Sequence, residues 1–309
     1  MACTDEVYRL QRGEDPDCKY FQKIAEQGHY KGRKGQSQQG IYVCSADGTF
    51  LASINSNSAD AVLKTLGKGL NEFAKLSEKS RSKFANDLVK ANFRWERYFP
   101  KNGIALAVYS RDLPEDLEPS SKRNSRWNRD SAWYHESEIK DLISKGLEVG
   151  DQFPMPTLLA ERLLRMNLVD TVRGQTDPFS KDEVSAAIQC TVTAVSDSTV
   201  MFSMAGETNS DSNSTSFRRT PRGIVTRVHG GATWSYTDSC FADFELVAIG
   251  YRWGRTRFNG RGRGPNSNPL GFVAKLAPKD EPPNVPGLIY AYGKAWFGAA
   301  RSTDGSKRK

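Results

Sequence analysis

Long hydrophobic runs are missing from this sequence. The longest, Ile104–Tyr109, is far shorter than the ~20 apolar residues that a helix needs to cross a bilayer. We therefore expect a soluble protein without a transmembrane segment. A basic n-region followed by an apolar h-region is also missing, so we expect no secretion signal. Because Ala2-Cys3 is also how a processed bacterial lipoprotein begins, both the cytoplasm and the cell envelope stay open as locations.

Motifs for metal, redox or nucleotide chemistry are missing too. The five cysteines are widely spaced and form no CxxC pair, which argues against a zinc ribbon and a disulfide framework. The three histidines share no spacing that would place two of them on one metal. No dinucleotide fingerprint or phosphate-binding loop occurs. We therefore expect no metal and no cofactor, and the sequence does not decide whether the protein is an enzyme.

Length and composition favour two domains of an ordinary globular protein. A single core stops growing at about 250–300 residues. This chain has 309 residues, of which 38% are hydrophobic and 26% are charged. The net charge of +8 permits a nucleic-acid partner but does not require one.

The first part of the chain carries the signals of a small unit with helices and a hairpin. An N-cap at Asp15 and a stop at Gly28 bound the first helix. The turn Asp47-Gly48 between two apolar strands predicts a β-hairpin. A second helix follows, with apolar residues expected on one face: Val62, Leu66, Leu70 and Phe73.

Further along the chain the pattern changes from helical to extended. Residues 77–98 are typical of one long amphipathic helix, and a short strand is expected at Ile104–Val108. Helical patterns return at 136–144 and 157–167. From Val184 onward, apolar residues alternate with polar ones, as in half-buried strands. We expect roughly six to eight antiparallel strands here, in a sandwich or a barrel. Asn209–Ser216, rich in Ser and Asn, is expected to be a mobile surface loop.

Short motifs carry a resemblance to a known family. They are Asp5–Gln11, Gln39–Tyr42, Val172–Gln175 and Gly250–Gly254, together with the order helix, strand, Asp-Gly turn, strand, helix in Asp15–Phe73. That order resembles the second half of a thioredoxin fold. The motifs are similar to those of an uncharacterised thioredoxin-like family of environmental bacteria, whose members pair such a unit with a β-rich C-terminal part.

The pattern and the resemblance together predict an α+β protein of four segments. Residues 1–76 would form a thioredoxin-like unit without CxxC, and residues 77–170 a helical connector. Residues 171–277 would form an antiparallel β-sandwich or barrel, and residues 278–309 a C-terminal tail. Because the CxxC pair is absent, the resemblance implies a non-redox binding or accessory protein.

Cys18 is the candidate nucleophile of an alternative, a thiol-dependent enzyme. It lies in the first turn of the first helix, where the helix dipole favours a thiolate. Asp15 and Asp17 oppose that negative charge, and Phe21 lies on the same face as Cys18. A buried structural cysteine is therefore the competing interpretation.

The segment Trp127–His135 is the candidate ligand site. It gathers side chains of the kinds that line pockets and orient ligands through cation–π contacts: Trp127, Arg129, Asp130, Trp133 and His135. The ligand would be a small molecule or a protein. The alternative is that the aromatic rings fill the junction between the two parts of the chain.

The segment 251–264 combines five arginines with three aromatic residues and four glycines. This composition is typical of loops that contact phosphates and stack on bases, so a nucleic acid or another polyanion is a further alternative partner. The arginines concerned are Arg252, Arg255, Arg257, Arg261 and Arg263. An exposed strand followed by a hairpin loop would explain the same pattern.

Overall fold

The computed structural model describes most of the chain in two compact units, Met1–Arg94 and Trp95–Lys309. The described residues are 2–4, 16–32, 38–56, 58–83, 98–100, 102–114, 126–213, 219–262, 267–278 and 284–297. Among the helices of these ranges, none combines the length and the hydropathy of a bilayer-spanning segment.

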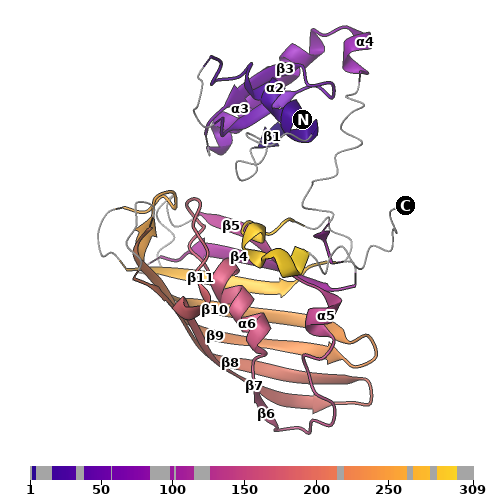
Figure 1. Cartoon of the computed structure of the whole chain (residues 1–309), viewed down its shortest axis with the longest axis vertical. Coiled ribbons are helices and arrows are strands. Elements are labelled where there is room, and N and C mark those ends of the chain that lie inside the picture. The colour runs from indigo at the N-terminus through magenta and orange to yellow at the C-terminus, as the bar shows by residue number, and fades with distance from the viewer. Residues whose placement is uncertain are drawn as a thin grey trace. The chain divides into compact units, whose positions relative to one another are not determined.

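The first unit contains short strands and helices (Figure 1). Its elements are β1 (Ala2–Thr4), α2 (Pro16–Ala25), β2 (Ile41–Cys44), β3 (Phe50–Ile54), α3 (Ala59–Ala74) and α4 (Glu78–Arg81). The strands form one sheet in the order β1-β2-β3, and both pairings are antiparallel. The turn between β2 and β3 is stabilised by Asp47, whose carboxylate accepts the backbone N–H of Thr49 at 3.2 Å, and by Gly48, whose φ is +84°.

The prediction of a thioredoxin-like unit at residues 1–76 is wrong. A thioredoxin fold contains a βαβ unit, in which a helix connects two parallel strands. Here β1 pairs directly and antiparallel with β2, the strand that follows α2. The predicted Asp-Gly hairpin is present, but among the described residues it belongs to a sheet of antiparallel strands alone.

The second unit is built around one large antiparallel sheet (Figure 1). Its strands are β4 (Ile104–Asp112), β5 (Trp127–Tyr134), β6 (Gln152–Pro154), β7 (Val184–Val195), β8 (Thr199–Ser212), β9 (Arg219–Ser235), β10 (Cys240–Thr256) and β11 (Asn268–Leu276). They lie in the order β5-β4-β11-β10-β9-β8-β7-β6. The helical elements are α5 (Glu136–Ile139), α6 (Thr157–Arg162), the π-helix η3 (Leu163–Asn167), and the 3₁₀-helices η4 (Lys181–Glu183) and η5 (Ile289–Tyr292).

Three expectations for this part of the chain are corrected. The described strands form a single open sheet with β5 and β6 at its edges, not a sandwich or a barrel. The expected helical connector, residues 77–170, contributes β4, which contains the short strand expected at Ile104–Val108, and also β5 and β6, which were not expected. β8 continues to Ser212, so the expected loop Asn209–Ser216 begins as a strand, and residues 214–218 lie outside the described ranges. Of the long helix expected at 77–98, residues 84–97 also lie outside them.

Helices, rather than a second sheet, cover one face of this sheet. We call this the inner face. α6 lies in front of it in Figure 1, and η3 contacts β5, β7 and β8. Apolar side chains that alternate along the strands are buried on this face, among them Ile188, Phe202, Val228, Leu246 and Phe272.

Glycines on the inner face let neighbouring strands approach closely. A Cβ added at Gly250 would lie only 1.8 Å from the carbonyl oxygen of Val225 on β9. We expect Gly250→Ala to lower the free energy of unfolding by about 1–3 kcal/mol, the usual cost of overpacking a core. Urea unfolding would measure it, with Gly231→Ala on β9 as the control because a Cβ there would lie 3.6 Å from its nearest neighbour, the carbonyl oxygen of Phe202. Equal stability of Gly250→Ala and the native chain would contradict the close approach.

Candidate functional site

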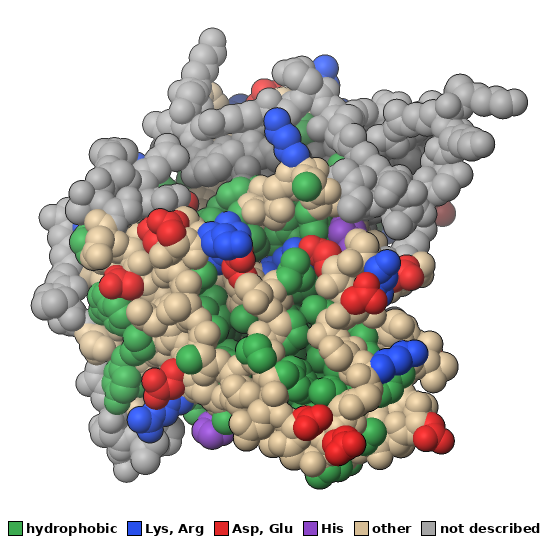
Figure 2. Space-filling model, turned by 60° about the horizontal axis from the view of Figure 1, so that its bottom comes forward, with side chains coloured by type: hydrophobic (Ala, Val, Ile, Leu, Met, Phe, Trp, Pro, Cys, Tyr) green, Lys and Arg blue, Asp and Glu red, His purple; other side chains and the backbone are tan. Residues whose placement is uncertain are grey.

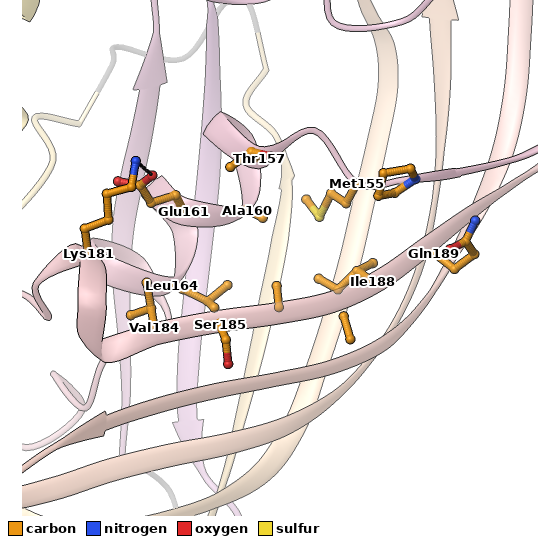
Figure 3. Close-up of a pocket in the computed structure, with 13 residues that line it drawn as sticks. Met155, Thr157, Ala160, Glu161, Leu164, Lys181, Val184, Ser185, Ile188 and Gln189 are labelled. Atoms are coloured by element: carbon orange, nitrogen blue, oxygen red, sulfur yellow. Dashed lines mark ion pairs between the residues drawn. The ribbon is translucent and has the colours of Figure 1, made fainter.

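A groove lies between α6 and the first half of β7 (Figure 3). It has a volume of about 400 Å³. We call it the α6–β7 groove. Its apolar lining comes from Met155, Ala160, Leu164 and Ile188. In Figure 2, hydrophobic side chains gather in a hollow on the face brought forward, which carries β6 and β7.

The groove runs beside a free edge of the sheet. β6 pairs only with residues 189–191 of β7, so no described strand pairs with Val184–Ile188 on that side. The backbone N–H of Met155 donates to the carbonyl of Ile188 at 2.9 Å, which shows that the polar groups of Ile188 point away from β8. Because these directions alternate along a strand, the N–H and C=O groups of Val184 and Ala186 point to the groove side as well.

Small side chains keep the groove open. Side chains alternate between the two faces along β7, so Ala186 lies on the same face as Ile188 and Cys190. Ile188 and Cys190 are buried, and the alternation predicts the same for Ala186. Burial raises the pKa of the Cys190 thiol to about 12. Ala186 is exposed instead, as are its neighbours Ser185 and Ala187. Ala186 therefore marks the place where the inner face of the sheet is uncovered, and its small neighbours Ser185 and Ala187 also line the groove.

One end of the groove carries charge. The carboxylate of Glu161 on α6 accepts Arg165 Nη1 at 2.9 Å and lies 3.2 Å from Lys181 Nζ. Figure 3 shows this pair at the end of the groove near Val184. The side chain of Lys181 is 78% exposed, so its ammonium group reaches solvent beside the groove. An acidic group entering the groove at this end would find a cation.

The residues predicted from Trp127–His135 do not come together in one pocket. They lie on β5 and directly after it, where alternation places Trp127, Arg129 and Trp133 on one face and Asp130 on the other. Trp127 is 62% exposed, whereas Trp133 is fully buried. None of these residues, nor His135, lines the α6–β7 groove.

Asp130 instead anchors a segment from the end of the described chain. Its carboxylate accepts the backbone N–H groups of Ser131 and Gly287, both at 2.8 Å, and Asn167 Nδ2 at 3.1 Å. Burial raises the pKa of Asp130, although these three donors act in the opposite direction. We call residues 284–297, which include Gly287, the C-terminal cover.

A second network holds the C-terminal cover to α5 and α6. Arg162 Nη1 donates to Glu138 Oε2 at 2.9 Å, and a further bond joins the same guanidinium to Glu138 Oε1. Trp296 Nε1 also donates to Glu138 Oε2, at 3.1 Å, and its ring stacks on His135 at 4.1 Å. Burial opposes the charge of Glu138, but the hydrogen bond and charge of Arg162 prevail and hold the pKa of Glu138 below its usual value.

His135 predicts a pH dependence of stability. Burial lowers the pKa of His135 in the folded protein. An unfolded His titrates near pH 6.5, so on acidification the unfolded chain takes up this proton first, and stability is lost as the pH falls through that range. We expect the urea midpoint to fall between about pH 7.5 and 5.5. His135→Gln should flatten that fall, whereas His229→Gln, at an exposed position, should keep it. An equal fall in all three proteins would contradict this role of His135.

The five arginines of segment 251–264 are separated by the structure. Arg252 and Arg261 are buried, Arg255 is half-buried and Arg257 is exposed, whereas Arg263 lies outside the described residues. The predicted polyanion-binding set therefore does not share one surface among the described residues.

The two buried arginines belong to an internal ion cluster. Arg261 donates from Nη2 to Asp112 Oδ1 at 2.7 Å and from Nε to Asp170 Oδ2 at 2.8 Å. Arg252 lies 3.0 Å from Asp170, and Arg173 donates to Asp112 at 2.7 Å. The cluster links the loop after β10 to Asp112 at the end of β4. It also links that loop to Asp170, which follows η3.

Cys18, the candidate nucleophile of the thiol-enzyme alternative, is fully buried in α2. The buried cluster beside it includes Phe21, Ile24 and Tyr42. In this conformation the thiol has no contact with solvent, and a substrate would need α2 to move before it could reach the sulfur.

Metal chemistry and known relatives add no further evidence. Within the part of the chain that the structure describes, no three His, Cys, Asp or Glu residues are grouped so that they could hold a metal ion. Comparisons with family models, with curated proteins and with solved structures give no match to this chain. The geometry and charge of the groove are therefore the evidence for function.

Proposed function

We propose that this protein is a binding protein whose α6–β7 groove accepts an extended polypeptide segment as an additional strand of the sheet. The observation that carries the proposal is the free edge Val184–Ala187, which runs beside an apolar groove. In strand addition, main-chain hydrogen bonds supply affinity and alternate side chains enter pockets that supply specificity. The main-chain groups of Val184 and Ala186 on this edge are available for such hydrogen bonds, and the apolar groove beside them can receive the alternate side chains.

The other edge of the sheet supports the same interpretation by contrast. Strand β5 is covered by the C-terminal cover, and the backbone N–H of Trp133 donates to the hydroxyl of Tyr292 at 3.1 Å. Proteins cover or blunt their edge strands because an open edge pairs with other chains. This chain covers one edge and leaves half of β7 open above an apolar groove, as expected if the open edge has a partner.

The groove also specifies the chemistry of the peptide. A strand rises about 3.3 Å per residue, so Val184–Ala187 matches a ligand of similar length. Met155, Leu164 and Ile188 favour apolar side chains at the alternate positions that face the groove. The exposed cation of Lys181 favours a carboxylate at the end near Val184.

Selection from a library of random peptides displayed on phage tests the proposal. Peptides selected on the native chain should share an alternating apolar pattern and an acidic residue. Ala186→Arg should weaken their binding at least about tenfold, equivalent to about 1.4 kcal/mol, because the new side chain occupies the groove. Ala205→Arg on β8 is the matched control, since Ala205 is also exposed, lies on the opposite face of the sheet and does not line the groove. Equal binding to both variants would overturn the proposal.

A further inference from the structure

The face of the sheet opposite α6 carries exposed aromatic, aliphatic and basic side chains. We call it the outer face. Strand register places one row of neighbours across β5, β4, β11, β10 and β9: Trp127, Arg111, Gly271, Ile249 and Arg227. The adjoining row is Arg129, Tyr109, Val273, Val247 and His229.

Aromatic rings and cations lie side by side at one end of the outer face. The centroid of the Tyr109 ring lies 6.4 Å from that of Trp127, with an angle of 35° between the planes. Arg129 Cζ lies 5.7 Å and Lys275 Nζ 5.6 Å from the Tyr109 centroid. Trp127 is mostly exposed, so its ring can stack on a base. The cations that lie beside Tyr109 can hold the phosphate of the same strand.

The other end of the outer face is hollowed. A depression of about 670 Å³ lies over β7–β10 and is lined by Val225, Ile249 and Tyr251 among others. Tyr251 is 56% exposed. Arg227 pairs with Glu207 in the same depression at 3.5 Å, and both side chains reach solvent. A second aromatic ring and a fourth basic position thus extend the surface beyond the cluster around Tyr109.

We propose that the outer face binds single-stranded nucleic acid. The two rows contain three arginines, Arg111, Arg129 and Arg227, and no acidic residue. The acidic residues of the outer face lie outside these rows: Glu207, Asp211, Asp243 and Glu245. The positive charge of these two rows favours a polyanion and disfavours the same rows of a second copy, which would repel them. The exposed aromatic rings add a preference for bases, since stacking on a sheet is how such surfaces hold single strands.

The depression on this surface adjoins the α6–β7 groove at Ser185, Ala186 and Ala187, which line both. The nucleic-acid proposal rests on the other face of the sheet and does not depend on the peptide-binding proposal. This surface also differs from the arginine-rich segment predicted from the sequence. Arg252 and Arg261 of that segment are buried in the ion cluster, whereas Tyr251, next to Arg252, faces outward.

Fluorescence anisotropy with a labelled oligothymidylate of twelve nucleotides tests the proposal on the full chain. We expect saturable binding at about 50 mM salt that weakens strongly at about 200 mM. Trp127→Ala should weaken it about tenfold through lost stacking, and Arg111→Glu should both weaken it and reduce the salt dependence. Matched controls are Tyr290→Ala and Lys140→Glu, exposed positions in η5 and at the end of α5 rather than on a strand of the sheet, which should bind like the native chain.

Four results would overturn the proposal. The first is no binding at low salt. The second is equal loss in the control variants, which would show unspecific attraction to a basic protein. The third is a Trp127→Ala variant that binds oligothymidylate as tightly as the native chain, together with full competition by inorganic polyphosphate. That result would show that the surface recognises charge alone. A dimer in size-exclusion chromatography that Trp127→Ala dissolves would likewise assign the face to a second copy.

Discussion

Replacing Arg261 with methionine is expected to lower the free energy of unfolding of the second unit by about 3–5 kcal/mol, the usual cost of removing one partner from a buried ion pair. The guanidinium bridges Asp112 and Asp170, all three residues being buried. Its loss would leave two buried carboxylates with one fewer cation between them. Methionine keeps much of the side-chain volume, so the cost measures charge more than packing.

Tryptophan fluorescence during urea unfolding measures this effect in the correct unit. All six tryptophans lie within Trp95–Lys309, so the signal reports on the second unit alone. Arg257→Met is the matched control from the same arginine-rich segment, because Arg257 is exposed. We expect Arg257→Met to change stability by less than about 0.5 kcal/mol. Similar losses in both variants would contradict a special role for the buried cluster.

Replacing Ala186 with proline is expected to abolish most peptide binding in the groove. The N–H of Ala186 points away from β8, so proline removes a donor from the free edge without removing a bond of the β7–β8 ladder. It also places its ring where an added strand would approach. We expect peptides selected on the native chain to bind at least about tenfold more weakly, which corresponds to about 1.4 kcal/mol.

The stability of Ala186→Pro separates this effect from misfolding. Because Ala186 is exposed and lies on a sheet edge, we expect a change in unfolding free energy of about 1 kcal/mol or less. Ser203→Pro on β8, a strand paired on both sides, is the contrasting variant and should be much less stable. Unchanged peptide affinity in a folded Ala186→Pro protein would contradict strand addition.

Local patterns in the sequence predicted local structure well. The Asp47-Gly48 turn and its flanking strands are present, because turn chemistry is decided within a few residues. The alternation that begins at Val184 predicts half-buried strands, and β7, β8 and β10 show it. The two-residue period of the apolar side chains does not say what covers the buried face. We therefore expected a sandwich or a barrel, whereas α6 and η3 cover a single sheet.

The arrangement of elements could not be read from these patterns. The hairpin and the helices of residues 15–73 fit a thioredoxin half equally well, and only the antiparallel pairing of β1 with β2 distinguishes the two. Pairing between distant segments leaves little trace in local periodicity. For the same reason β4 and β5, separated from the strands at 184–276 by helices, were expected to belong to a helical connector.

The candidate sites show the same limit. Composition marked Trp127–His135 and the arginines at 251–264, but strand alternation sends neighbouring side chains to opposite faces. Arg252 thus joins a buried cluster, while Tyr251 lies exposed on the outer face. The groove depends on an edge that β6 leaves unpaired, and only the small residues Ser185-Ala186-Ala187 mark it in the sequence.

The most direct test of strand addition is amide hydrogen exchange at the free edge of β7. It would be measured by NMR with and without a peptide selected on the native chain. The account predicts that the amide of Ala186 exchanges quickly in the unliganded protein and becomes strongly protected in the complex, while that of Ala187, already paired with β8, changes little. An Ala186 amide that exchanges at the same rate in the saturated complex would contradict it.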